Sequence, residues 1–261
     1  MKLLFVGDVV GKPGRRALHH FLPELIDRHL IDYVVVNVEN AAGGFGVTYD
    51  ILKDFETLPI DCYTSGNHIW DKKESLAMLD ENPKLLRPLN YPEGNPGHGV
   101  HVGETAAGVP VATLNVEGQV FMKALPSPFH ETDAALAELD ASIQVILVDF
   151  HAEATSEKQA MGFHLDGRVS AVLGTHTHVP TADARILSGG TAFQTDVGMT
   201  GPYESIIGMR ADRVLHRFLL NTHASFEVAK RDVRLAAAIL DIDEKTGRAR
   251  SIEPLLLSMP A

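Results

Sequence analysis

The chain has 261 residues, a formal net charge of −11 at pH 7 and 45% hydrophobic residues. This length and composition predict a globular protein with a sizeable core, built as one large domain or as one domain with a small insertion. The acidic balance opposes binding of a long nucleic acid, which requires many Lys and Arg contacts to phosphates. The single cysteine, Cys62, excludes an internal disulfide and a thiolate-rich zinc site. A bound metal would therefore be held by His, Asn and carboxylate side chains.

The apolar run at the start of the chain is short, because it meets Gly7 and Asp8 after six residues. A run of that length is too short for the apolar core of a signal peptide. We therefore expect a cytoplasmic protein that does not associate with membranes. The sequence leaves the oligomeric state open, and a homo-oligomer is compatible with it.

Strand-like and helix-like segments alternate along the chain. A strand over 2–6, a helix over 15–29 and a strand over 32–38 form a unit that requires a crossover, and hence parallel pairing of the two strands. Asp8 and Glu39, which follow these strands, should emerge at the same edge of a sheet. Next comes a helix over 48–58, which the Thr48 hydroxyl would cap. Further strands are expected over 60–64, 109–116, 143–150, 168–173 and 191–195, with helices over 131–139 and from about 212.

Two regions are less regular. A short helix should begin near Trp70, and residues 82–98 are rich in Pro, Gly and Asn. We interpret 70–98 as the best candidate for a small cap or lid, with an ordinary surface excursion as the alternative. At the other end of the chain, the segments 225–230, 235–243 and 248–257 resemble antiparallel strands joined by turns.

The most informative stretch is 173–179, where His176 and His178 stand two residues apart after an apolar run. In an extended or tightly turning backbone this spacing sends both imidazoles to the same side. Imidazole is the commonest metal ligand near neutral pH. The pair alone fits two solvated loop histidines at least as well.

Further metal-competent side chains follow other predicted strands. In an open α/β sheet the carboxyl ends of the strands share one edge, where functional sites form. Taken singly, each residue also fits a plain role, such as a turn residue, a local hydrogen bond, or packing of a histidine on Trp70. Their common placement is hard to attribute to chance. The residues are Asp8, Glu39, Asn40, Asn67, His68 and His151.

This set resembles the calcineurin-like metallophosphoesterase superfamily, whose motifs run Asp-x-His, Gly-Asp, Gly-Asn-His, a lone His and Gly-His-x-His. The matching stretches are Gly7-Asp8, Gly66-Asn67-His68, His151 and Gly174-Thr175-His176-Thr177-His178, with Thr175 interposed in the last. The resemblance implies an α/β fold: a layered metallophosphoesterase sandwich of two mixed β-sheets flanked by helices. It also implies one metallophosphoesterase domain over 1–261.

Two positions depart from the superfamily pattern. Val10 stands where a coordinating histidine is usual, and Glu39, followed by Asn40, stands where an aspartate usually bridges the metals. A carboxylate one methylene longer can still bridge two cations, and the Asn40 carbonyl can fill the vacancy at Val10. Together with the stretches 5–11, 149–158 and 196–202, these departures resemble the bacterial YmdB-like branch. That resemblance implies a dinuclear phosphodiesterase active on 2′,3′-cyclic nucleotides.

The chemistry of such a site follows from general principles. Two cations roughly 3.5 to 4 Å apart would clamp the phosphoryl oxygens of a small anionic phosphodiester and lower the pKa of a bridging water, so that hydroxide attacks in line with the leaving oxygen. His68 is left for proton work, stabilising phosphoryl oxygens or protonating the departing alkoxide. Because the ligands are hard to borderline, we expect iron, with manganese and zinc as alternatives. We assign Asp8, Asn40 and His178 to one cation, Asn67, His151 and His176 to the other, and Glu39 to both.

Other classes of function stay open. Because Val10 removes one expected ligand, the chain could be a binding or regulatory protein with a catalytically weak metal site. A barrel-type metal amidohydrolase ranks lower, since its His-x-His pair belongs near the first strand. A nucleotide-binding loop at Gly11-x-x-Gly14 lacks the third glycine and the Gly-Lys-Ser/Thr ending. Thr200 is a candidate for facing the substrate, although the flanking glycines fit a plain turn.

Overall fold

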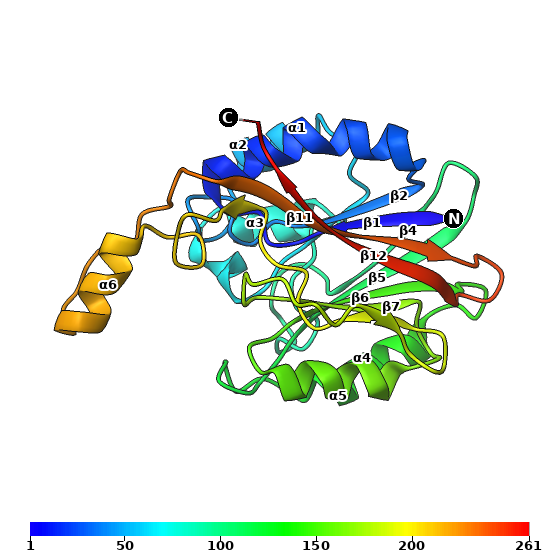
Figure 1. Cartoon of the computed structure of the whole chain (residues 1–261). Coiled ribbons are helices and arrows are strands. Elements are labelled where there is room, and N and C mark those ends of the chain that lie inside the picture. Colours follow the sequence, from blue (N-terminus) through cyan, green and yellow to red (C-terminus); the bar gives the residue numbers. More distant parts are fainter. Residues whose placement is uncertain (261) are drawn as a thin grey trace.

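Two mixed β-sheets pack face to face in the computed structural model, which describes residues 1–260, and helices cover their outer faces (Figure 1). In the first sheet the order is β10-β11-β1-β2-β3, with β12 also pairing β11. The strands β1, β2 and β3 are parallel, whereas β11 runs antiparallel to β1, β10 and β12. The bounds are β1 Lys2–Val6, β2 Tyr33–Asn37, β3 Cys62–Thr64, β10 Gly201–Pro202, β11 Val233–Ile242 and β12 Ala249–Ser258.

The second sheet has the order β4-β5-β6-β7-β9-β8. Its four inner strands are parallel, and β4 and β8 pair antiparallel at the two edges. The layered α/β sandwich of two mixed sheets, expected from the sequence, is confirmed. The bounds are β4 Val100–Glu104, β5 Pro110–Glu117, β6 Val145–His151, β7 Ala171–Thr175, β8 Arg185–Ile186 and β9 Ala192–Gln194.

The helices lie on both outer sides, except for α6. In Figure 1, α1 and α2 lie over the first sheet, α4 and α5 lie over the second, and α6 stands away from the body. None of the helices within residues 1–260 is both long and apolar enough to cross a bilayer. The bounds are α1 Gly11–His29, α2 Tyr49–Phe55, the 3₁₀ helix η1 Asn67–Asp71, α3 Ser75–Glu81, α4 Pro128–Glu138, α5 Thr155–Leu165 and α6 Ala211–Leu220.

Alternation along the strands builds the core in three layers. On β1, Leu4 packs toward α1 while Leu3 packs between the two sheets, because successive side chains of a strand point to opposite faces. On β6, Leu147 joins the layer between the sheets, and Phe150 packs toward the helix side. The inner strands of both sheets are thus buried on both faces, which explains why they are nearly continuous apolar runs in the sequence.

Several local predictions were wrong at their ends. The helix α1 begins at Gly11, four residues before the predicted start. Thr48 precedes α2, but its hydroxyl forms no cap; the Tyr49 amide instead donates to the carboxylate of Glu74 at 2.9 Å. The segment 225–230 is not a strand, although Val228 forms a single bridge with Met209. At the start of α2, a contact distant in sequence decided the local structure.

The helix α5 was not expected, and its sequence explains why. Its buried positions include Glu157 and Lys158 as well as Met161 and Leu165, so it has no clean apolar stripe. Residues 70–98 comprise the end of η1, α3 and an irregular stretch. Leu79 of α3 and Leu85 of the irregular stretch pack into the core layer between the first sheet and its helices. The role of 70–98 as a cap stays a prediction.

Candidate metal centre

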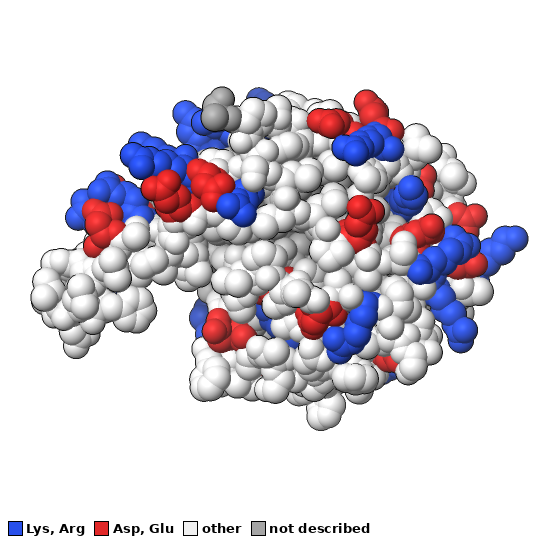
Figure 2. Space-filling model, in the orientation of Figure 1, with Lys and Arg blue, Asp and Glu red and all other residues white. Residues whose placement is uncertain are grey.

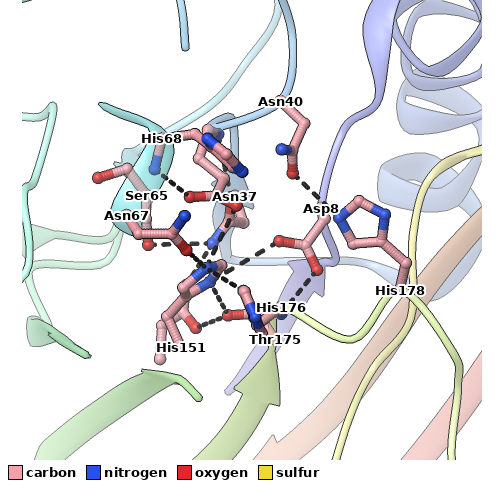
Figure 3. Close-up of polar contacts among 12 residues, drawn as sticks. Asp8, Asn37, Asn40, Ser65, Asn67, His68, His151, Thr175, His176 and His178 are labelled. Carbon is pink, nitrogen blue, oxygen red and sulfur yellow. Dashed lines mark hydrogen bonds and ion pairs between the residues drawn. The ribbon is translucent and has the colours of Figure 1, made fainter. Parts of the chain in front are cut away.

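The parallel strands of both sheets end on the same side of the sandwich, and the predicted ligand side chains meet there (Figure 3). The first sheet supplies four of them, which follow β1, β2 and β3. The second sheet supplies three histidines at the ends of β6 and β7. These residues are Asp8, Glu39, Asn40 and Asn67 from the first sheet, and His151, His176 and His178 from the second.

One group of potential ligands centres on His151. Ligand atoms of Glu39, His151 and His176 lie within 4.8 Å of one another. The His151 Nε2 is 3.2 Å from Glu39 Oε1, 3.0 Å from His176 Nδ1 and 3.1 Å from Asn67 Oδ1. Four nitrogen and oxygen atoms, all from predicted ligands, therefore surround one small region.

A second group shares Glu39 with the first. Ligand atoms of Asp8, Glu39 and His178 also lie within 4.8 Å of one another. The His178 Nε2 is 3.2 Å from Asn40 Oδ1. The Asn40 amide oxygen therefore lies next to the second group. Because Glu39 belongs to both groups, its carboxylate has the position that a bridging ligand requires.

Hydrogen bonds behind the histidines orient the rings toward these groups. His178 Nδ1 lies 2.9 Å from the Ile207 carbonyl, which can only accept, so this nitrogen carries the hydrogen and Nε2 presents a lone pair. His151 Nδ1 lies 2.9 Å from the Thr175 hydroxyl, which itself donates to Asp149 at 2.7 Å. The Thr175 oxygen therefore accepts from His151, and the Nε2 lone pair of that ring faces the site.

His176 is oriented the other way round. Its Nε2 lies 3.2 Å from the Glu153 carboxylate, which leaves Nδ1 facing His151. Figure 3 shows the rings of His151 and His176 pointing toward each other below Asp8. Each of the three imidazoles, in its neutral form, thus directs a lone pair at one of the two ligand groups, an arrangement that bound cations would satisfy.

Unsatisfied polar atoms support the same interpretation. The Asp8 Oδ1 is buried and has no hydrogen-bond partner, while its other oxygen accepts from the His176 amide at 3.2 Å. Buried polar atoms without a partner are costly. A cation placed beside Asp8 Oδ1 removes this penalty. The residues present therefore fit bound metal.

Burial and close charges shift the pKa values in this region. Burial, helped by Asp196 and Glu39 and partly offset by His178 and His151, raises the pKa of Asp8 to about 6. Burial opposes ionisation of Glu39 too, but His151 and the His68 amide outweigh it and lower the pKa of Glu39 to about 2.

The two coupled histidines shift in opposite directions. Burial disfavours the charged form of His151, yet the Glu39, Asp8 and Asp149 carboxylates raise its pKa to about 9. Burial together with the neighbouring His151 lowers the pKa of His176 to about 3. The site therefore attracts positive charge, which His151 supplies as an imidazolium when no cation is bound.

A buried ion pair supports the His176–His178 loop. Lys158 Nζ lies 2.6 Å from Asp196 and donates to the Thr175 carbonyl at 2.7 Å. Asp196 also accepts from the Thr177 amide and hydroxyl at 3.1 and 2.8 Å. The loop needs such support, because His176 has φ 98° and a non-glycine residue adopts that conformation only under constraint. The pair gave no local sequence signal, since its members are far apart in the chain.

His68 lies beside the two ligand groups and belongs to neither. Its amide donates to Glu39 Oε2 at 3.0 Å, and its Nδ1 lies 2.7 Å from Asp71. The side chain is 29% exposed, which leaves it accessible from solvent. The sequence analysis missed Asp71, although its position three residues after His68, in the same short helix, was a usable signal.

Thr200 does not face the site. Its hydroxyl is buried, donates to the Ala236 carbonyl at 3.2 Å and accepts from the Ala236 amide at 3.1 Å. The idea that Thr200 contacts substrate is therefore wrong, and the residue instead joins its loop to β11. Its backbone amide donates to the Asp8 carbonyl at 2.9 Å, which ties this loop to the end of β1.

Solved structures share this fold along the whole chain. A crystal structure of a hypothetical protein from Thermus thermophilus matches with a TM-score of 0.93 and 45% identity, over 100% of both chains. A crystal structure of a novel phosphatase from Mycoplasma pneumoniae matches with a TM-score of 0.93 and 33% identity, over 99% of this chain and 93% of that one. The fold is thus shared with a phosphatase of known structure.

The sequence comparisons define the family. The family model described as YmdB-like protein matches residues 4–255. The 2′,3′-cyclic-nucleotide 2′-phosphodiesterase of Bacillus subtilis (strain 168) is 45% identical over 258 residues, which cover 99% of this chain and 97% of that protein. The chain belongs to the YmdB-like family, and the predicted resemblance to this branch of the metallophosphoesterases is confirmed.

Proposed function

We propose that this chain is a two-metal phosphodiesterase that hydrolyses small phosphodiesters, foremost 2′,3′-cyclic nucleotides. The observation that carries the proposal is the position of Glu39, whose carboxylate is shared by two groups of potential metal ligands. The name of the Bacillus subtilis relative supports the choice of substrate. Val10 cannot coordinate a metal, but the Asn40 amide oxygen lies next to His178 and can serve as a ligand in its place. This supports a catalytically active site over a weak metal-binding one.

The proposed ligands divide into two sets that share Glu39. Bound cations, iron or else manganese or zinc, would neutralise phosphoryl oxygens and lower the pKa of the water that attacks phosphorus. The hydrogen-bond acceptors on the far side of each ring are the Ile207 carbonyl for His178, the Thr175 hydroxyl for His151 and the Glu153 carboxylate for His176. They keep each imidazole in the tautomer that coordination needs. We assign Asp8, Asn40 and His178 to one cation, Asn67, His151 and His176 to the other, and Glu39 to both.

His68 has the proton-transfer role. It follows Asn67 directly and lies beside Glu39, so its imidazole can reach a phosphodiester held at the site. Asp71 orients the ring by accepting from Nδ1. In the reaction, the attacking water releases a proton to solvent as its oxygen bonds to phosphorus, the bond from phosphorus to the leaving oxygen breaks, and His68 donates the proton that this oxygen gains.

The charge distribution favours a small substrate. On the face in Figure 2, Lys and Arg are interspersed with Asp and Glu, and they form no continuous basic stripe. The carboxylates of Asp8 and Glu39 would repel a phosphate unless cations reverse the local charge. Affinity for the anion is therefore confined to the metal site, which suits one phosphodiester group better than a long polyanion.

Elemental analysis and a substrate panel test this proposal. Protein purified without added metal should contain about two ions per chain. It should hydrolyse 2′,3′-cyclic AMP and bis-p-nitrophenyl phosphate, and a chelator should abolish turnover until metal is returned. Stoichiometric metal with no turnover of any phosphodiester, in any of the three metals, would identify a binding or regulatory protein instead.

A further inference from the structure

The glycine-rich loop 43–46 is built onto the candidate metal centre. The Asn40 side-chain amide donates to the Gly44 carbonyl at 3.0 Å, and the Gly44 amide donates to the Asn40 carbonyl at 3.0 Å. The glycines at 43, 44 and 46 have φ of 71°, 96° and 74°, a backbone conformation that residues other than glycine rarely adopt. Three glycines thus surround one large side chain, Phe45, which they hold beside a proposed ligand.

Phe45 joins His68 to a second aromatic ring. Its ring lies 4.9 Å from the His68 ring, edge to face, and 6.4 Å from the Phe226 ring at an angle of 25°. Phe226 is 38% exposed, and the Arg217 guanidinium lies 4.5 Å from its ring centroid. The three rings come from the loop after β2, from η1 and from the segment after α6. They form a continuous aromatic surface that begins at the proposed proton donor.

The segment carrying Phe226 is anchored at the same end of the sandwich. Val228, two residues after Phe226, forms a β-bridge with Met209, which precedes α6. The Met209 side chain lies so close to Gly44 that a Cβ atom on residue 44 would clash with it. Ile207, which lies two residues before Met209 and precedes α6, accepts from His178 through its carbonyl. In Figure 1 the segment leaves the body at the end toward which β1 runs. Phe226 therefore belongs to the surroundings of the metal centre and not to a remote surface.

We propose that Phe45 and Phe226 form a stacking surface for the nucleobase of a nucleoside phosphodiester, an inference that rests on the proposed function. In a 2′,3′-cyclic nucleotide, the leaving oxygen and the base are attached to neighbouring carbons of one ribose. A leaving oxygen within reach of His68 therefore brings the base to the ring that contacts His68. Phenylalanine rings stack on any base, and the Arg217 guanidinium, which lies over the Phe226 ring, adds a planar cation to this surface.

The surface selects for an aromatic base without reading which base it is. Stacking uses the π-face that every base has, and the two phenylalanines offer no hydrogen-bond donors or acceptors to the base edges. Cyclic phosphates of adenosine, guanosine, cytidine and uridine should therefore differ in kcat/KM only several-fold, with purines ahead. A cyclic phosphate of a sugar without a base should be clearly poorer.

Full-length metal-loaded protein tests this with two substrates, 2′,3′-cyclic AMP and methyl riboside 2,3-cyclic phosphate. The measured quantity is the ratio of their kcat/KM values, which cancels general damage to the metal centre. Phe226→Ala should lower this ratio about tenfold, and Phe226→Trp should keep it. Phe45→Leu should lower it while preserving the apolar packing of the loop. The matched control is Phe163→Ala, an exposed ring (63%) on α5, which should leave the ratio unchanged.

Binding of the product gives a second readout that does not depend on turnover. Equilibrium dialysis should show adenosine 3′-monophosphate binding more tightly than ribose 3-phosphate, and Phe226→Ala should remove most of that difference. A substrate ratio and a binding difference that are the same in the parent and in Phe226→Ala would overturn the stacking surface. If the parent hydrolyses neither substrate, the proposed function fails, and the dialysis still decides for or against the surface.

Discussion

Glu39 Oε1 and His151 Nε2 lie 3.2 Å apart, and the two residues come from different sheets. Glu39 follows β2 of the first sheet, whereas His151 ends β6 of the second. Both side chains are buried, at 1% and 0% exposure. The candidate metal centre is therefore assembled by the packing of one sheet on the other, and a shift between the sheets would separate its ligands.

Replacing Glu39 with Gln should weaken both metal positions together. The amide keeps the size of the side chain but removes the charge and one coordinating oxygen that a bridge needs. We expect metal affinity to fall at least about tenfold at each position, measured by elemental analysis after dialysis. Glu104→Gln, on the exposed part of β4, is the control. Loss of one ion with full retention of the other would contradict a bridging role.

Replacing His68 with Ala should preserve the fold and the metal content while lowering kcat about a hundredfold, because a positioned proton donor contributes roughly that much. The measurement is turnover of 2′,3′-cyclic AMP, with metal content determined on the same sample. Asp71→Asn should lower kcat less, since the ring remains and only its orientation is lost. Unchanged turnover in His68→Ala would remove the proton-transfer role.

Metal affinity should increase with pH. Cation binding must displace a proton from His151, whose pKa is raised to about 9, and below pH 6 also one from Asp8, whose pKa is raised to about 6. We expect about tenfold tighter binding per pH unit between pH 6 and 9, and a steeper dependence below pH 6. Competition with a chelator indicator of known affinity measures this. Affinity that is constant from pH 5.5 to 8.5 would contradict it.

The same shifts predict the stability of the metal-free protein. A group whose pKa is raised by folding stabilises the folded state below its unfolded pKa, and that contribution is lost as the pH rises through the folded pKa. For Asp8 the loss occurs between pH 3.8 and about 6, and for His151 between pH 6.5 and about 9. The difference in Tm between metal-loaded and metal-free protein should therefore widen from pH 6 to 9, as differential scanning calorimetry can measure.

Replacing Lys158 with Met should destabilise the fold, because it leaves the buried Asp196 carboxylate without its cation. Breaking a buried pair in this way costs about 3 to 5 kcal/mol of the free energy of unfolding, measurable by denaturant titration. Arg231→Met, which breaks an exposed pair with Glu204, should have little effect. Equal effects of the two substitutions would mean that the buried pair does not support the His176–His178 loop.

Local pattern was enough to predict the parallel core of the fold and the candidate ligands. Apolar runs identified β1, β2, β5, β6 and β11, since each strand is buried on both faces or nearly so. Polar side chains directly after such runs lie at the carboxyl edge by geometry alone. Predictions failed where the deciding partner was remote, as for the Glu74 carboxylate at the start of α2.

The sequence by itself therefore determined the alternation of strands and helices, the side of the sandwich that carries the site, and the identity of its candidate ligands, because these depend on residues that are close in the chain. Only the tertiary structure decided which nitrogen of each imidazole faces the site, and that Phe45 meets Phe226. These depend on distances between residues far apart in the chain, which are set when the two sheets pack.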